Sequence, residues 1–242
     1  MKLIVGNWKS NPNTIATAEK LALAEDYEGV VIVPPFQYLE RVKSQLKNAL
    51  LGAQDVFWEK SGAFTGEISA EQLRDSAVEY VIVGHSERRA LGEDAHEVAR
   101  KLEVILDSQM IPILCVGEKN RDEEGEYFHF VQEEIESALA NVSHTNIKKI
   151  IIAYEPIWAI GKGNESISTH DMHEMSIFIK KTLIPLFGKK LASGVSILYG
   201  GSVDRNNTEA LIKEGEINGF LVGRASLDAN HFKDIISIVE KI

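Results

Sequence analysis

The chain has 242 residues, of which 44% are hydrophobic, 26% charged and 7% aromatic. This is the composition of an ordinary globular protein, and the length suits one large α/β domain or two small ones. The 36 acidic residues outnumber the 26 basic ones and give a formal net charge of −10, so the broad basic surface of a nucleic-acid-binding protein is not expected.

Short apolar runs recur along the whole chain. Each is rich in Val, Ile and Leu and does not alternate with polar residues, which is typical of strands buried on both faces and therefore of a parallel sheet. The predicted strands are residues 2–7, 29–34, 49–54, 79–85, 111–117, 149–155, 194–200 and 219–223.

The first and fifth runs also bear on location and redox chemistry. The first has at most five consecutive apolar residues, which is too few for a signal peptide. No segment approaches the ~20 apolar residues of a membrane-spanning helix, so we expect a cytoplasmic protein without a membrane partner. The fifth run, "IPILCVG", contains the single cysteine, Cys115, which we expect to be a buried structural thiol rather than a nucleophile.

Apolar residues spaced by three and four predict amphipathic helices between the strands. Four such stripes are Leu39, Val42, Leu46 and Ala49; Ala95, Val98, Leu102 and Ile105; Val131, Ile135, Leu139 and Val142; and Met172, Met175, Ile179 and Leu183. The acidic run at 122–126 is interpreted as a solvated loop or a helix start.

A strand followed by a helix, repeated about eight times, predicts right-handed βαβ units. Eight such units in a chain of this length predict an α/β fold, a single (β/α)8 barrel with eight parallel strands. An open, doubly wound sheet is the alternative, but it usually has fewer strands in this length. Because no linker or change of composition divides the chain, we expect residues 1–242 to form one domain.

Polar residues follow several of the predicted strands. Asn7 and Lys9 follow the first, His85 follows the fourth, and Glu155 ends the sixth. Singly, Lys9 is explained as a surface lysine and His85 as a core histidine, and we expect the other six histidines at the surface. In a barrel, however, these strand ends share one rim, where active sites form. A carboxylate at the end of an apolar strand, as in Glu155, is a candidate for chemistry.

Two glycine-rich turns, "YGGSV" (199–203) and "VGRAS" (222–226), follow the seventh and eighth strands. In barrels this position often binds phosphate through backbone N–H groups. An acidic protein binds the dianion in this way because local amides and Lys9 supply the positive field. The P-loop and dinucleotide motifs are absent, so the sequence predicts a reaction on a small phosphate ester without cofactor or metal. Proton abstraction next to a carbonyl group fits these residues.

Several segments together resemble the triosephosphate isomerase family. They are "GNWK" (6–9), "GAFTGEIS" (62–69), "GHSERR" (84–89), "CVGE" (115–118), "AYEPIWAIGKG" (153–163), "YGGSV" and "GFLVGRAS" (219–226). The resemblance runs from residue 3 to about residue 228. It implies a (β/α)8 barrel that interconverts D-glyceraldehyde 3-phosphate and dihydroxyacetone phosphate, in glycolysis and gluconeogenesis.

The family is a standard example of a carboxylate base that works with a neutral imidazole and a closing loop, and the resemblance brings these roles with it. Glu155 is then the base, and His85 is the electrophile that polarises the carbonyl. Asn7 and Lys9 support the enediolate and the phosphate. Residues 156–166 form a lid. The implied substrate-binding residues are Asn7, Lys9, Gly161, Ser202, Gly223 and Arg224.

The sequence departs from the family pattern at a few positions. Arg224 stands where a second glycine is usual, Asp55 replaces a familiar Asn, and the segment 89–93 is one residue shorter. The second lid hinge, Asn164-Glu165-Ser166, is also unusual. By resemblance, the loop around Thr65 docks into a second copy of the chain and forms a homodimer.

Other functions compete with this interpretation. A sugar-phosphate epimerase would need His and Asp metal ligands at the strand ends, which we do not find. An aldolase would need a desolvated lysine inside the barrel, and only Lys9 lies near the rim. A non-catalytic phosphometabolite-binding barrel is the third alternative, and the presence of both Glu155 and His85 disfavours it.

Overall fold

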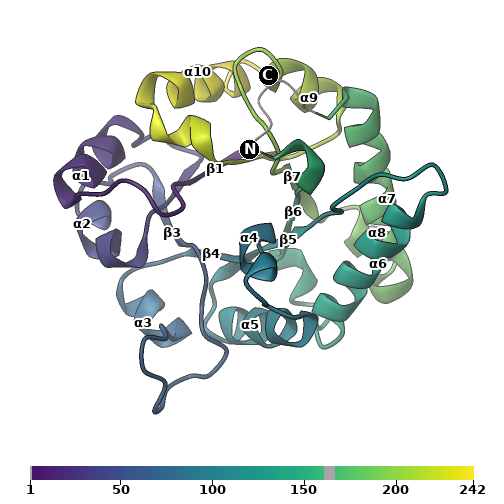
Figure 1. Cartoon of the computed structure of the whole chain (residues 1–242), viewed down its shortest axis with the longest axis horizontal. Coiled ribbons are helices and arrows are strands. Elements are labelled where there is room, and N and C mark those ends of the chain that lie inside the picture. Colours follow the sequence, from purple (N-terminus) through teal and green to yellow (C-terminus); the bar gives the residue numbers. More distant parts are fainter. Residues whose placement is uncertain (1, 161–166) are drawn as a thin grey trace.

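A computed structural model describes residues 2–160 and 167–242. In this part of the chain, eight parallel strands close into a barrel in which each strand pairs with the next and β8 pairs with β1 (Figure 1). The predicted (β/α)8 architecture is therefore confirmed. The strands are β1 Leu3–Asn7, β2 Val30–Val33, β3 Leu50–Ala53, β4 Tyr80–Val83, β5 Ile111–Val116, β6 Ile151–Tyr154, β7 Ser196–Tyr199 and β8 Gly219–Val222.

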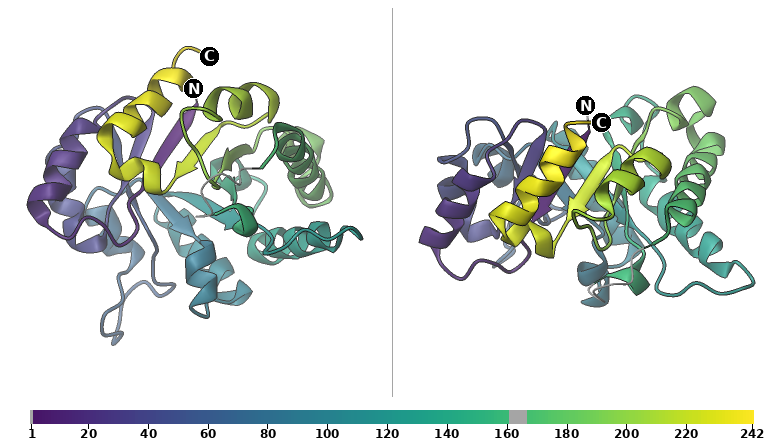
Figure 2. Two further views of the ribbon diagram at one scale, coloured as in Figure 1. Left: turned by 45° about the horizontal axis from the view of Figure 1, so that its top comes forward. Right: turned by 90° about the horizontal axis from the view of Figure 1, so that it is seen from above.

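Helices surround the barrel on its outer side, as the two turned views in Figure 2 show. The α-helices are α1 Ile15–Ala24, α2 Leu39–Lys43, α3 Ala70–Asp75, α4 Ser86–Ala90, α5 Ala95–Asp107, α6 Glu126–Leu139, α7 Thr169–Phe187, α8 Lys189–Ala192, α9 Thr208–Glu214 and α10 Ala229–Val239. Short 3-10 helices are η1 Phe36–Tyr38, η2 Ile147–Lys149, η3 Ile157–Ala159 and η4 Arg224–Leu227.

Side-chain caps fix where several helices begin. Ser69 and Gln72 form a reciprocal capping box at the start of α3, and Asp94 and Glu97 form another at α5. Such caps satisfy N–H groups that have no partner within the helix. They stop the helices from extending back into the loops that follow β3 and β4.

The predicted helix over Leu39 to Ala49 is only partly correct. Helix α2 ends at Lys43, and Leu46 and Ala49 lie beyond it. The Asp26 carboxylate accepts hydrogen bonds from the backbone N–H groups of residues 47, 48 and 49 at 2.8–3.0 Å. These bonds hold the chain in a turn that leads into β3.

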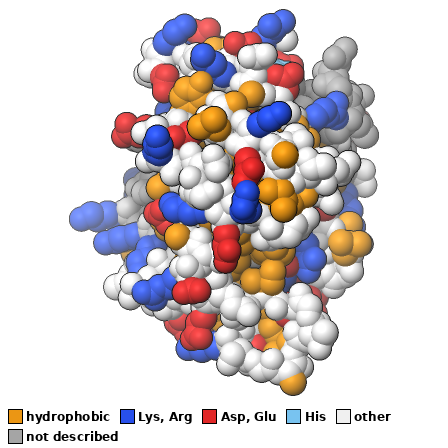
Figure 3. Space-filling model, turned by 90° about the vertical axis from the view of Figure 1, so that its left-hand side faces the viewer, with side chains coloured by type: hydrophobic (Ala, Val, Ile, Leu, Met, Phe, Trp, Pro, Cys, Tyr) orange, Lys and Arg blue, Asp and Glu red, His pale blue; other side chains and the backbone are white. Residues whose placement is uncertain are grey.

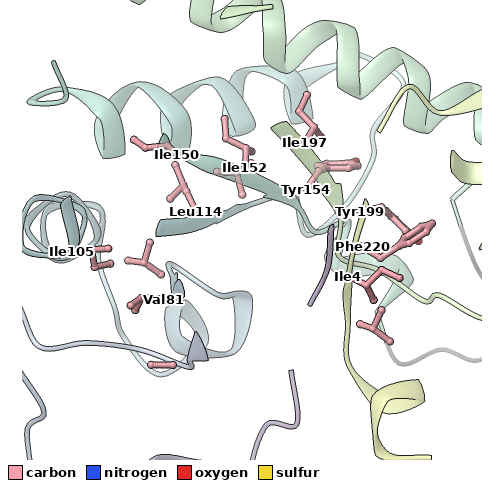
Figure 4. Close-up of a cluster of buried hydrophobic side chains, with 14 of the residues drawn as sticks. Ile4, Val81, Ile105, Leu114, Ile150, Ile152, Tyr154, Ile197, Tyr199 and Phe220 are labelled. Carbon is pink, nitrogen blue, oxygen red and sulfur yellow. The ribbon is translucent and has the colours of Figure 1, made fainter. Parts of the chain in front are cut away.

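The hydrophobic core has two layers. Inside the barrel lie Val5, Val31, Val33, Ile82, Ile113, Cys115, Ala153, Leu198 and Leu221. The larger layer lies between strands and helices, and Figure 4 shows part of it, with Ile152, Ile197 and Phe220 from three strands and Ile105 from α5. Cys115 is fully buried, as predicted, and burial raises the pKa of its thiol well above the ordinary value.

The two-residue period of the strands decides which polar side chains enter the barrel. Val5 and Ala153 point inward, so Asn7 and Glu155, two residues further on, point inward as well. By the same period, Leu198 and Leu221 are followed by Gly200 and Gly223, which lack side chains. The end of the barrel where the strands terminate is therefore hollow, and it carries the amide of Asn7 and the carboxylate of Glu155.

The surface over α1 and α2 mixes Lys and Arg with Asp and Glu, with small hydrophobic patches between them (Figure 3). This face has no broad basic area of the kind that binds nucleic acid. No helix in the described ranges is both long enough and apolar enough to cross a membrane.

A buried carboxyl group lies behind the first strand. Glu25 is 0% exposed, and its Oε2 accepts a hydrogen bond from Trp8 Nε1 at 3.1 Å. Burial raises the pKa of Glu25 from 4.5 to about 9. At pH values between 4.5 and about 9, Glu25 is ionised in the unfolded chain but remains protonated in the folded protein. The stabilising contribution of protonated Glu25 is therefore complete below pH 4.5 and is lost as the pH rises toward 9.

Glu25→Gln is expected to flatten this pH dependence, because the amide keeps an oxygen for Trp8 and does not titrate. Between pH 5.5 and pH 8.5, the parent should lose on the order of 2 kcal/mol more unfolding free energy than the variant. Urea unfolding at both pH values measures the difference. Glu28→Gln, at an exposed position nearby, is the control, and an identical pH dependence in all three proteins would contradict the buried-carboxyl explanation.

Candidate active site

A cavity of about 580 Å³ opens at the carboxyl ends of the strands. It brings together every predicted site residue that the structure describes: Asn7, Lys9, His85, Glu155, Ser202, Gly223 and Arg224. Gly161 and the hinge residues 164–166 lie outside the described residues. The chain contributes these side chains from β1 and from the ends of β4, β6, β7 and β8, so the barrel closure is what assembles them.

Glu155 directly follows β6 and is 2% exposed. One carboxylate oxygen, Oε2, accepts a hydrogen bond from the backbone N–H of Ser86 at 3.1 Å. The other, Oε1, lies 3.2 Å from His85 Nε2. A buried carboxylate held by so few donors keeps lone pairs available to accept a proton from a bound molecule.

His85 is the N-cap of α4, and its ring nitrogen Nδ1 accepts a hydrogen bond from the backbone N–H of Glu87 at 3.1 Å. A nitrogen that accepts cannot carry the proton, so in the neutral ring the proton is on Nε2. Nε2 faces Glu155 in the cavity. The helix start thus places the imidazole with Nε2 3.2 Å from the carboxylate.

Lys9 adopts a left-handed backbone conformation with φ of 53°, which is uncommon for a residue other than glycine. The turn is held from both sides, because Lys9 N donates to Asn7 Oδ1 at 3.0 Å and Gln54 Nε2 donates to Lys9 O at 2.7 Å. Lys9 Nζ contacts Glu87 Oε1 at 2.5 Å. An ion pair at this exposed rim is weak, so the ammonium group remains available to an anion.

The glycine turns give the cavity its space. A Cβ atom on Gly200 would come within 2.8 Å of Glu155 Cγ, and one on Gly223 would lie 3.5 Å from Lys9 Cε. Ser202 donates through Oγ to Ala159 O at 2.8 Å, which links the first glycine turn to the segment after Glu155.

Glu118 holds the start of that segment, a role that the sequence motifs did not indicate. Its backbone oxygen accepts from Ile157 N at 3.0 Å, and its carboxylate accepts from Trp158 Nε1 and from Tyr154 OH, both at 2.8 Å. The first residues after Glu155 are therefore fixed to the loop that follows β5.

Other residues of the site were not predicted. Asn11, Asp204, Asp228 and His231 also line the cavity, although His231 was expected at the surface. Asp228 caps α10, and only the curvature of the barrel brings that helix start to the rim. Asp55, which departs from the family pattern, contacts the buried Lys101 Nζ at 2.7 Å and Arg88 Nε at 3.0 Å.

Among residues 2–160 and 167–242, no three His, Cys, Asp or Glu side chains gather in a way that would hold a metal ion.

The fold and this rim define an enzyme of the (β/α)8-barrel class. The model of the family described as triosephosphate isomerase matches residues 2–239. A triosephosphate isomerase of Thermoanaerobacter pseudethanolicus is 42% identical over 247 residues, covering 97% of this chain and 98% of that protein. Those of Roseiflexus sp. (41% identical, 97% and 96% covered) and Flavobacterium johnsoniae (37% identical, 98% and 98% covered) are also similar.

The chain therefore belongs to the triosephosphate isomerase family. Its activity is the isomerisation of triose phosphates, the interconversion of D-glyceraldehyde 3-phosphate and dihydroxyacetone phosphate in glycolysis.

Proposed function

We propose that Glu155 is the base of this isomerisation and that His85 is its electrophile. The observation that carries the assignment is the 3.2 Å distance between Glu155 Oε1 and His85 Nε2 inside the cavity. A base and a proton donor this close reach two neighbouring atoms of one small substrate. The whole chain acts as one catalytic domain, and its glycolytic reaction supports a cytoplasmic location.

The proposed reaction moves one proton between adjacent carbons. Glu155 takes the proton from the carbon next to the carbonyl group while His85 Nε2–H donates a hydrogen bond to the carbonyl oxygen. An enediolate forms, and its negative charge lies near His85 and Lys9. His85 Nε2 gives its proton to the former carbonyl oxygen and takes the proton of the neighbouring hydroxyl group. The protonated Glu155 then returns its proton to the former carbonyl carbon, which gives the isomeric product and restores the carboxylate. No cofactor is consumed in these steps.

The phosphate of the substrate is proposed to lie over the two glycine turns. The contributing groups are Asn7, Lys9, Ser202, Gly223 and Arg224, together with Gly161 from the lid. Gly223 lies beside Lys9, because a Cβ atom added to it would be in ordinary contact with Lys9 Cε at 3.5 Å, and this proximity supports the position. At Arg224 the backbone N–H serves the phosphate, as the glycine usual at this position would.

The test of these roles is conversion of D-glyceraldehyde 3-phosphate to dihydroxyacetone phosphate with no metal or nucleotide added, followed through a coupled glycerol-phosphate dehydrogenase. Fast turnover of the parent and loss of turnover in Glu155→Gln support the assignment. If the parent is folded, binds a phosphoglycolate analogue and yet does not turn over, the phosphometabolite-binding alternative is favoured.

We also propose that the chain forms a homodimer through the loop around Thr65. The segment between β3 and α3 projects from the barrel (Figures 1 and 2). It carries an aromatic cluster in which the Phe57 ring lies 4.4 Å from that of Trp58 and 4.7 Å from that of Phe64. Phe64 is 44% exposed. An exposed apolar group of this kind is typical of an interaction surface, and a second copy of the chain would cover it near its own Lys9.

Thr65→Arg is expected to convert the dimer into a monomer with kcat lowered about 10-fold or more, because Lys9 and its neighbours lose the partner loop that orients them. Sedimentation and turnover at nanomolar concentration measure both effects. Thr145→Arg, at an exposed position in the loop after α6, should remain dimeric and active. A parent that is monomeric and fully active at nanomolar concentration would refute the proposal.

A further inference from the structure

Two charged side chains outside the cavity connect the backbone segments that carry Glu155 and His85. Arg89 on α4 and Glu134 on α6 form an ion pair with 3.3 Å between Arg89 Nε and Glu134 Oε1. Their side chains are only 18% and 10% exposed. An ion pair this deeply buried is costly to form, and the isomerisation steps described above do not use it.

Arg89, the basic member of the pair, contacts the backbone next to His85. Arg89 Nε donates to Gly84 O at 2.8 Å, and Nη2 approaches Cys115 O at 3.4 Å. Gly84 directly precedes His85 and has a φ of 69°. A Cβ atom there would come within 2.9 Å of Arg89 Nη2, so the guanidinium group packs directly on the turn that delivers His85.

Glu134, the acidic member of the pair, contacts Gly117, which packs against the backbone of Glu155. Glu134 Oε2 accepts a hydrogen bond from Gly117 N at 2.9 Å. Gly117 packs against the Glu155 backbone so closely that a Cβ atom on it would lie 1.9 Å from Glu155 O. The Glu155 backbone N–H in turn donates to Val116 O at 2.8 Å. A displacement of Glu134 would therefore move Gly117, and the close contact between Gly117 and Glu155 would then displace the Glu155 backbone.

Charge provides a second link between the pair and the base. Burial raises the pKa of Glu134, and the negative charge of Glu155 raises it further, while Arg89 opposes both effects. Because this interaction is mutual, the charges of Glu134 and Arg89 act on Glu155 with opposite signs. Among the described residues, the titratable and charged groups near Glu155 come from several elements. They are His85 after β4, Cys115 on β5, Arg89 on α4, Glu118 after β5, Glu134 on α6 and Lys9 across the cavity.

We propose that Glu134 and Arg89 are positioning residues for the isomerisation, which fix the backbone beneath Glu155 and His85 and balance the charge felt by the Glu155 carboxylate. This inference rests on the proposed role of Glu155 as the base. It assigns a function to two helices, α4 and α6, that contribute no other side chain to the proposed chemistry.

The proposal predicts opposite changes in the pH profile. Glu134→Gln removes a negative charge and leaves the Arg89 charge unbalanced, so the acid limb of kcat/KM should move to lower pH by about 1 pH unit. Arg89→Gln removes the positive charge and should move the same limb to higher pH. The double variant should return toward the parent. In both single variants kcat should fall about 10-fold, with KM within about 2-fold.

Glu133→Gln is the matched control, because Glu133 is the neighbouring residue on α6 and its side chain is 66% exposed. It removes the same charge at the surface and should leave the limb in place. Circular dichroism and thermal unfolding establish that each variant is folded. If Arg89→Gln does not fold, the comparison of Glu134→Gln with Glu133→Gln decides the question.

An acid limb that stays fixed in folded Glu134→Gln, or that moves in the same direction in both single variants, overturns the proposal. If Arg89 and Glu134 had only a structural role, their substitution would change stability but would not shift the acid limb of kcat/KM in opposite directions. Failure of the proposed function is recognised separately, since Glu155→Gln would then keep its turnover or the parent would show none.

Discussion

Glu155→Asp is expected to lower kcat about 10²-fold or more while the affinity for a phosphoglycolate analogue changes little. The shorter side chain retracts the carboxylate by one methylene, and a misplacement of about 1 Å at a reacting group costs ~10²-fold. It also moves the carboxylate away from Ser86 N and His85 Nε2, which lie 3.1 and 3.2 Å from it in the parent. The turns that we propose to bind the phosphate are untouched.

The measurement is steady-state turnover in both directions together with the inhibition constant of the analogue. Glu155→Gln keeps the length of the side chain but cannot take up the proton, so it separates loss of basicity from loss of reach. Glu28→Asp, which shortens an exposed carboxylate away from the cavity, is the control. Equal losses of kcat and of inhibitor affinity in Glu155→Asp would count against a role confined to proton transfer.

Gly117→Ala is expected to lower the free energy of unfolding by about 3 kcal/mol and to reduce activity strongly. Its Cβ atom would lie 1.9 Å from Glu155 O and 3.1 Å from Glu155 Cα. Neighbours with little freedom to move cannot accommodate an atom this close, and overpacking of this kind costs ~1–3 kcal/mol or more. The strain falls on the backbone of the proposed base, so activity should suffer even in the folded fraction.

Urea unfolding and turnover of the purified variant measure the two effects. Gly194→Ala is a suitable control, because an added Cβ there meets its nearest neighbours at 3.5 and 3.8 Å, which is ordinary contact. We expect Gly194→Ala to unfold within about 1 kcal/mol of the parent. A Gly117→Ala variant as stable and active as this control would show that the segment after β5 moves freely relative to Glu155.

The sequence alone determined the fold class and most of the site. Apolar runs without alternation indicated buried parallel strands, and the eight strands of the barrel lie within the eight predicted runs. The strands end earlier than several runs, so that His85, Glu155, Gly200 and Gly223 follow them. Glu155 stood out because a carboxylate is unexpected at the end of an apolar strand, whereas His85 was indicated by the shared rim and by the resemblance of its motif.

Helix ends and long-range partners were decided by the tertiary structure. The predicted helix ended early because Asp26, from a different loop, binds the backbone of residues 47–49. His231 and Asp228 reach the cavity because barrel closure places α10 beside β1. These contacts join segments that are distant in the sequence, so no local sequence pattern predicts them.

The pairing of Glu134 with Arg89 has the same origin. Glu134 is one of several glutamates on α6, and the apolar stripe that includes Val131 and Ile135 places it nearer the buried face than Glu133. The sequence does not show, however, that its partner is Arg89. Packing of α6 against the barrel buries one and leaves the other in water. The sequence therefore indicated the proposed reacting groups, whereas the groups that hold them in place depend on which distant segments the closed barrel brings together.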